Sequence, residues 1–256
     1  MERPESLAGR RLEDITVTEL KRLNVERLRQ SASQQGRFED SGEDLAWGSR
    51  AWLVVDPEDG RIPPVTAEAK SRTAARLLAR QRGPADPWTE FDLFSRCITR
   101  GLPSSMIPAI YGNSYEIVQA PGSVAIVYEM IHDTRVIPLD RRPHVGPSVR
   151  SYLGDSRGHF DGDALVIETA NFKEAASFLG SSRDLVLTER FTPMGKDHLE
   201  WRVTLHDLAT WERPWTFAMT LTRTTERPLE FGCHEGNYFI RNALTGSRAT
   251  GNSIRQ

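Results

Sequence analysis

The sequence predicts a mainly β fold, an antiparallel up-and-down β-barrel of the lipocalin-like kind with an N-terminal helical extension. Three observations predict it. Stretches of alternating apolar and polar residues follow one another from Tyr115 to Leu221, turn-forming residues separate them, and helical spacing is confined to the first hundred residues. About eight or nine strands in sequence could close into a barrel, which would remove exposed edges. A two-sheet β-sandwich is the alternative.

Two helices are expected near the N-terminus. Residues 16–35 place apolar side chains near helical spacing, with Thr16 or Thr18 as a cap candidate. A second helix, rich in Ala, Arg and Leu, is expected over Thr66–Arg82 and ends at Gly83-Pro84.

These helices define the expected domain organisation. A short strand at 52–55 and a short helix at 88–96 accompany them. We therefore expect residues 1–100 to form an extension that packs on the barrel, and residues 101–256 to form the barrel, as one structural unit.

Three of the predicted strand regions carry more specific expectations. The strand over 124–132 is apolar on both faces, so Glu129 and His132 should lie in or beside a core. Pro138 lacks a ladder donor and favours an edge or bulged strand. Asp161-Gly162 favours a type I′ hairpin. The other strands are expected at residues 115–119, 136–139, 185–191, 199–205 and 215–221, and on either side of the hairpin.

Composition narrows the possible partners and location. The 256 residues include 33 Lys+Arg and 35 Asp+Glu, and the net charge of −2 gives no reason to expect nucleic acid as a partner. No apolar run is long enough for membrane insertion. No leader follows Met1, so we expect either a cytoplasmic protein or a mature exported chain. The two cysteines could form one bridge or stay free thiols.

Six segments stand out as motifs, namely VVDPEDGRIPP (54–64), EMIHDTRVIPLD-RPH (129–144), GDSRGHFDGDALVIETANF (154–172), ERFT (189–192), WERPWT (211–216) and CHEGNY (233–238). Together they resemble the motifs of a large family of bacterial proteins of unknown activity, which are common in soil bacteria and usually carry an export leader. The resemblance covers most of the chain from about residue 50. It implies a periplasmic or secreted protein and a disulfide between Cys97 and Cys233.

Acid–base catalysis is the leading hypothesis for the chemistry. Either His132 or His234 would take a proton, while a neighbouring carboxylate orients the ring and Arg135 holds an anionic or carbonyl group. The carboxylate candidates are Glu129, Asp133 and Glu235. Substrate would be bound by a barrel mouth formed by Tyr115, Tyr128, His144, Trp215 and Tyr238.

Other interpretations of the same residues remain open. His132, His144, His234 and Glu235 would be an acceptable metal-ligand set, although none of the histidines are closely spaced. As a purely structural alternative, Glu129 would pair with Arg135 and His234 would bond to a backbone carbonyl. No nucleotide-binding or nucleophile-elbow motif is present, so no organic cofactor is expected.

Together these observations predict an exported enzyme of lyase, hydrolase or isomerase type. It would act on a small, partly apolar organic molecule by His/carboxylate chemistry. The alternative is a lipocalin-like carrier without catalysis. Ionisable groups that converge in a cavity would favour the enzyme, and an almost purely apolar cavity would favour the carrier.

Overall fold

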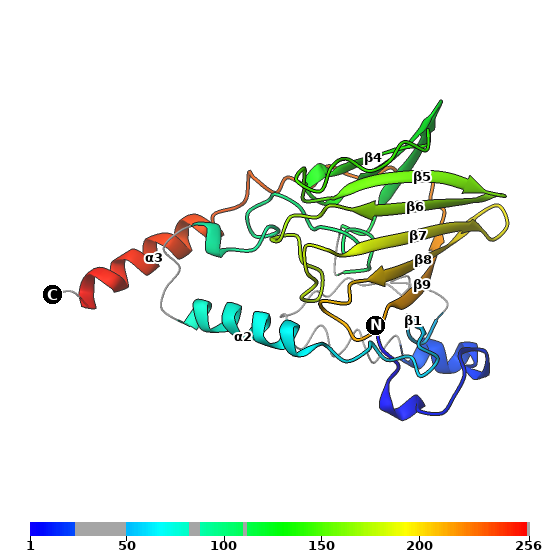
Figure 1. Cartoon of the computed structure of the whole chain (residues 1–256), viewed down its shortest axis with the longest axis horizontal. Helices are drawn as coiled ribbons and strands as arrows, with labels where there is room; N and C mark the ends of the chain where they lie inside the picture. Colours follow the sequence, from blue (N-terminus) through cyan, green and yellow to red (C-terminus); the bar gives the residue numbers. More distant parts are fainter. Residues whose placement is uncertain (24–49, 82–87, 110–111, 255–256) are drawn as a thin grey trace.

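The structure, a computed structural model, describes residues 1–23, 50–81, 88–109 and 112–254. Six strands form the larger sheet, in which every neighbouring pair is antiparallel (Figure 1). Its order is β1-β9-β8-β7-β6-β5, so all strands but β1 follow one another in the sequence. The strands are β1 (Val54–Asp56), β5 (Asp155–Asp161), β6 (Ala164–Ala170), β7 (Val186–Pro193), β8 (His198–His206) and β9 (Trp215–Thr222).

The smaller sheet has three antiparallel strands in the order β2-β3-β4, namely β2 (Tyr115–Ala120), β3 (Ser123–Tyr128) and β4 (Thr134–Pro138). β4 lies against β5, since a methyl group added to Gly158 would come within 2.7 Å of Ile137 Cγ2. Among the described strands, no hydrogen-bonded ladder joins β4 to β5. The mainly β, antiparallel prediction is therefore confirmed, and the arrangement is sandwich-like rather than a closed barrel.

The core lies between the two sheets and is built from the residues that the alternating patterns place inward. Trp201, Val203 and Leu205 of β8 are buried, and so is Ile126 of β3. Aromatic rings fill much of this space, with Trp201 and Phe217 in edge-to-face contact at 5.4 Å between ring centres. The interior is thus packed with side chains along most of its length.

The helical predictions are largely met where the structure describes them. α2 runs over Ala67–Gln81, and Thr66 Oγ1 accepts a hydrogen bond from Ala69 N at 3.1 Å. Residues 17–23 are helical, whereas 24–35 lie outside the described residues. Of the helix expected at 88–96, only η3 (Trp88–Glu90) forms, as a 3₁₀ turn.

Two local predictions about the strands are wrong. β3 ends at Tyr128 and is followed by η4 (Met130–His132), because Ile131 (φ 63°) and His132 (φ 54°) adopt left-handed conformations that no strand tolerates. The β5–β6 loop consists of Gly162 and Asp163. Gly162 has φ 60° but Asp163 is not left-handed, which fits a type II′ turn rather than type I′.

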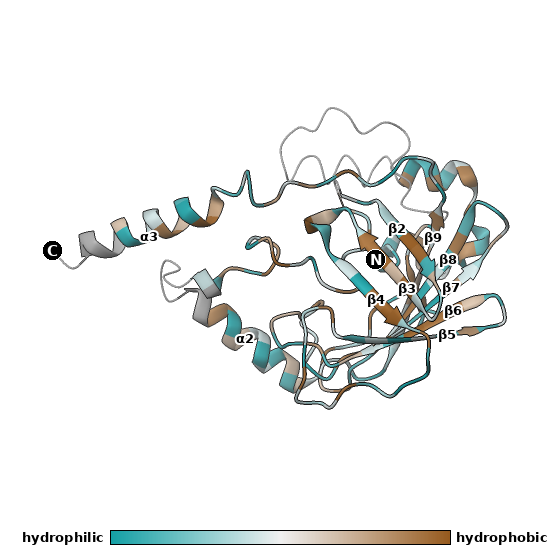
Figure 2. Cartoon of the chain, turned by 90° about the horizontal axis from the view of Figure 1, so that it is seen from above, coloured by the Kyte–Doolittle hydropathy of each residue, from teal (hydrophilic) through white to brown (hydrophobic). Residues whose placement is uncertain are grey.

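Two features lie outside the sheets, a disulfide and a C-terminal helix. Cys97 and Cys233 form the disulfide expected from the family resemblance and link the segment before β2 to the segment after β9. α3 (Phe239–Ile254), which was not predicted, extends away from both sheets in two perpendicular views (Figures 1 and 2). None of the helices in the described residues is long and apolar enough to cross a membrane.

Candidate functional site

The predicted catalytic residues of the 129–135 segment are separated by the turn at η4. Its two left-handed residues direct His132 to the surface, where Nε2 lies 3.0 Å from Glu230 Oε1. The His132 side chain is 45% exposed. Glu129 accepts a hydrogen bond from Ser114 N at 3.1 Å and does not pair with Arg135, so the structural alternative for Glu129 is wrong.

Asp133 points the other way, into a partly buried position. Its carboxylate accepts a hydrogen bond from the Thr99 hydroxyl. Burial raises the pKa of Asp133, and the hydrogen bonds from Thr99 and from the Thr134 amide only partly offset this. Asp133 and His132 are therefore neighbours in sequence that do not act on one another.

Arg135 pairs through both terminal guanidinium nitrogens with a carboxylate that was not predicted as its partner. It forms a two-pronged ion pair with Glu189 of β7, and Nη2 lies 3.1 Å from Oε1. Both side chains are buried, and Trp201 Nε1 donates to Glu189 Oε1 at 3.1 Å. Burial alone would lower the pKa of Arg135, but the charge of Glu189 outweighs it and the pKa is raised. The alternating pattern contained a signal for Glu189, since it shares the inward face of the strand with Leu187 and Phe191.

The aromatic residues predicted to bind substrate lie in different environments. Tyr128 and Trp215 are fully buried, and neither the Tyr128 hydroxyl nor Trp215 Nε1 has a hydrogen-bond partner among the described residues. Burial raises the pKa of Tyr128 and of its cross-strand neighbour Tyr115. Tyr238, in contrast, is exposed. These residues do not form one binding surface.

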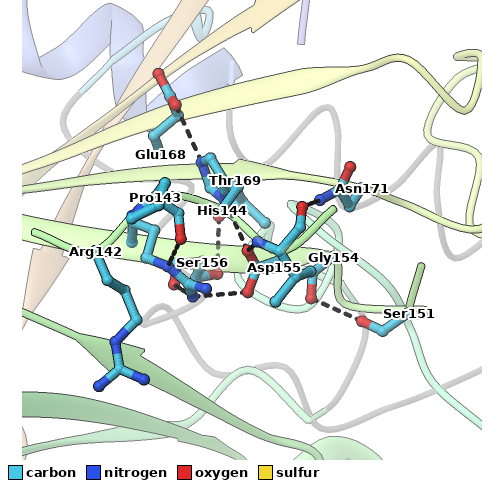
Figure 3. A network of polar contacts seen from close by, with 12 residues as sticks. Arg142, Pro143, His144, Ser151, Gly154, Asp155, Ser156, Glu168, Thr169 and Asn171 are labelled. Carbon is cyan, nitrogen blue, oxygen red and sulfur yellow. Dashed lines mark hydrogen bonds and ion pairs between the residues drawn. The ribbon is translucent and has the colours of Figure 1, made fainter. Parts of the chain in front are cut away.

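His144 has the most developed polar environment of the six histidines (Figure 3). It lies in the loop before β5, with Nδ1 2.9 Å from Asp155 Oδ2 and Nε2 3.1 Å from Glu168 Oε1. Asp155 and Arg157 alternate with buried Ser156 along β5, so this network lies on the outer face of the sheet. We call His144, Asp155, Arg157 and Glu168 the His144 network.

Asp155 is the best-anchored member of the His144 network. It accepts hydrogen bonds from the Val145 amide at 3.0 Å and from Arg157 Nη1 at 2.6 Å. Burial would raise the pKa of Asp155, but the hydrogen bonds from Val145 and His144 and the charge of Arg157 outweigh it, so the pKa is lowered. Asp155 therefore remains ionised at neutral pH and orients the His144 ring.

The contacts with Asp155 and Glu168 determine which nitrogens of the His144 ring carry a proton. An ionised carboxylate only accepts hydrogen bonds, so both contacts together require the doubly protonated ring. The Glu168 side chain is 58% exposed, whereas that of His144 is 23% exposed. Rotation of Glu168 into solvent would free Nε2 while Asp155 retains Nδ1. His144 was predicted to bind substrate, whereas Asp155, Arg157 and Glu168 were not predicted as site residues, although all three lie in the 154–172 motif.

The residues after Cys233 are not brought to the other predicted site residues. His234 and Glu235 are exposed, and their side chains form no hydrogen bond or ion pair with the part of the chain that the structure describes. Hence His132 and His234 share no proton-transfer network. Nor do any three His, Cys, Asp or Glu side chains of the described ranges form a group able to hold a metal ion.

One cavity of about 520 Å³ borders a predicted site residue, Tyr115. It lies between β2 and the adjoining ends of β8 and β9, and it is closed further by residues 223–228. Its apolar lining includes Tyr115, Ile117, Leu199 and Leu221, and charged residues of both signs surround these. Neither His132, His144 nor His234 lines it.

Comparisons with known proteins return no matching family model, no matching curated protein and no matching solved structure. The family resemblance therefore stays a prediction.

Proposed function

We propose that the protein is an enzyme that acts on a small, partly apolar organic molecule by His/carboxylate acid–base chemistry, with His144 as its proton-transfer group. The observation that carries the proposal is the contact of Asp155 with Nδ1 of a half-buried histidine whose Nε2 faces an exposed partner, Glu168. An acid–base group of this kind needs one ring nitrogen fixed and the other accessible.

The chemistry follows from the two protonation states of His144. With Glu168 turned away, protonated Nε2 can donate its proton to a leaving group or a developing oxyanion. The neutral ring, still donating from Nδ1 to Asp155, can then take a proton from water or from substrate carbon. Asp155 stabilises the cation by its charge and does not itself accept the proton. This sequence serves a hydrolase, a lyase or an isomerase.

The surroundings of His144 support a partly apolar substrate. Val145 and Val149 belong to the same loop, and both expose a large part of their side chains. Arg142 belongs to the same loop and lies at the surface, where its guanidinium pairs with Asp140. A small organic molecule with an apolar body and a carbonyl or carboxylate group would match these neighbours.

Two further features bear on the proposal. The Cys97–Cys233 disulfide supports export to the periplasm or outside the cell, because disulfides persist in oxidising compartments. The carrier alternative receives less support, since charged residues of both signs border the cavity near Tyr115.

A substrate screen with matched variants tests the proposal. The purified protein would be assayed against chromogenic esters, lactones, epoxides and β-hydroxy acids, and any activity found would be compared in His144→Asn and His159→Asn. His159 is exposed on the same strand as Asp155 and serves as the control. We expect His144→Asn to lower kcat/KM by about 10²–10⁴-fold and His159→Asn to leave it unchanged. An activity that survives in His144→Asn but disappears in His132→Asn would overturn the assignment.

A further inference from the structure

The β2 strand leaves one of its two edges unpaired. β3 pairs with β2 along all six residues in unbroken register, and no strand of the described residues pairs with β2 on the other side. An unpaired edge presents main-chain donors and acceptors to any chain that comes alongside. Proteins usually protect such edges with Pro, Lys or a bulge, and the sequence YEIVQA of β2 has none of these.

The direction of the main-chain groups on β2 follows from one hydrogen bond. Glu129 N donates to Ser114 O, so Ser114 faces β3. Hydrogen-bonding direction alternates along an antiparallel strand. Glu116 and Val118 therefore also face β3, whereas the N–H and C=O groups of Tyr115, Ile117 and Gln119 face the free edge.

The 520 Å³ cavity lies along this edge. It is lined by Tyr115 and Ile117, whose side chains face the core, and also by Glu116, whose side chain faces outward. A cavity that touches both faces of a strand must pass around its edge. Main-chain groups of Tyr115 and Ile117 are thus available beside the apolar lining formed by Leu199 and Leu221.

The charges around the cavity match a ligand that carries both signs. Arg223 and Arg227 line it together with Glu116 and Glu226, and the side chains of these four form no ion pair with the described residues. A peptide main chain offers alternating donors and acceptors, and its apolar side chains would fit between Ile117 and Leu199. A ligand with a single negative or positive head would leave half of these charges unmatched.

We propose that the β2 edge binds an extended peptide segment of alternating apolar and polar residues as an additional β-strand. The peptide would exchange hydrogen bonds with Tyr115, Ile117 and Gln119, and every second side chain would enter the cavity. Strand addition of this kind derives affinity from main-chain bonds and selectivity from pockets for alternate side chains. This site is separate from the His144 network and does not depend on its activity.

The first test uses a phage-displayed library of random dodecapeptides on the intact protein, and then a synthetic copy of an enriched sequence. We expect enriched peptides to alternate apolar and polar residues. Amide hydrogen exchange with the synthetic peptide should slow at Tyr115, Ile117 and Gln119 but stay unchanged at Glu116 and Val118, which β3 already protects. Protection elsewhere, or no enriched peptide, would overturn the proposal.

A variant pair then tests the main-chain contact itself. Ile117→Pro removes the free-edge donor without touching the β2–β3 ladder, and Val118→Ala, on the same strand but outside the cavity lining, keeps every main-chain donor. We expect affinity to fall about tenfold in Ile117→Pro, as for the loss of one buried hydrogen bond, and to change less than twofold in Val118→Ala. Equal affinities in wild type and a folded Ile117→Pro would contradict strand addition. Saturable binding of a fatty acid or detergent instead of peptide would identify an amphiphile pocket and refute it.

Discussion

Two groups of charged side chains in this protein have opposite surroundings. The Arg135–Glu189 pair is sealed between the sheets, with exposed fractions of 3% and 0%. The His144 network lies on the outer face of the larger sheet, where Glu168 reaches solvent. A buried pair without access to water holds its charges fixed and stabilises the fold, whereas a histidine at the surface can exchange protons. The buried Arg135–Glu189 pair therefore has a structural role, and the solvent-accessible His144 network is the candidate for catalysis.

Breaking the buried pair should have the largest effect. We expect Glu189→Gln or Arg135→Met to lower the free energy of unfolding by about 3–5 kcal/mol, because either change leaves a charged or polar partner unmatched in the core. Urea denaturation followed by tryptophan fluorescence measures this. The double variant Arg135→Met/Glu189→Leu should lose less than either single variant. A double variant as unstable as the sum of the two singles would contradict this account.

Removal of the disulfide should have the second-largest effect on the free energy of unfolding. It would show how the loss of a covalent link compares with the loss of the buried ion pair. The bridge joins residues 136 positions apart, so its loss should lower the free energy of unfolding by about 2–5 kcal/mol. The comparison is between wild type and Cys97→Ala/Cys233→Ala in urea without reductant. With reductant present, the two proteins should converge, and a difference that persists would assign the loss to packing at Cys97.

The His144 network should contribute a smaller, pH-dependent amount. The folded-state pKa of Asp155 is lowered, so its stabilising effect is complete above the unfolded pKa of about 3.9 and disappears as the pH falls through the folded value. Asp155→Asn should therefore cost up to about 1 kcal/mol at pH 7, and little at the lowest pH at which both proteins remain folded. Thermal unfolding across this range measures the difference, and a cost that does not vary with pH would exclude the ionic explanation.

Asp133 should show the opposite sign and the smallest effect. Its folded-state pKa is raised, so stability falls as the pH rises from about 3.9 through the folded value. Asp133→Asn keeps an acceptor for Thr99 without the charge and should slightly stabilise the protein at pH 7. Melting temperatures at pH 7 and pH 4 would test this, since the gain should shrink at the lower pH. Destabilisation at pH 7 would show that Thr99 requires the carboxylate.

Much of the fold could be predicted because strand periodicity is a local property. The alternation over 199–205 and 215–221 placed β8 and β9 and their buried residues correctly. The choice between a closed barrel and two separate sheets, which were both predicted as possible, could not be made from the sequence, since it depends on whether β4 and β5 align their main chains. β1 joins the larger sheet from the N-terminal third, which no local pattern could show.

The candidate site was predicted far less well, for an equally physical reason. Sequence proximity placed His132 beside Asp133, but the left-handed turn at η4 sends them to different environments. His144, Asp155 and Glu168 come together across a loop and two strands. The ion-pair partner of Arg135, Glu189, lies 54 residues further along the chain.

The gap in hydrogen bonding between β4 and β5 also defines the mechanics of the molecule. Within each sheet, pulling neighbouring strands apart must break a ladder of main-chain bonds. Along the contact of Gly158 with Ile137, the described residues offer only side-chain packing, reinforced nearby by the single ion pair of Arg135 with Glu189. Under tension, the contact between β4 and β5 should therefore open first, while the disulfide keeps the segment before β2 tied to the segment after β9.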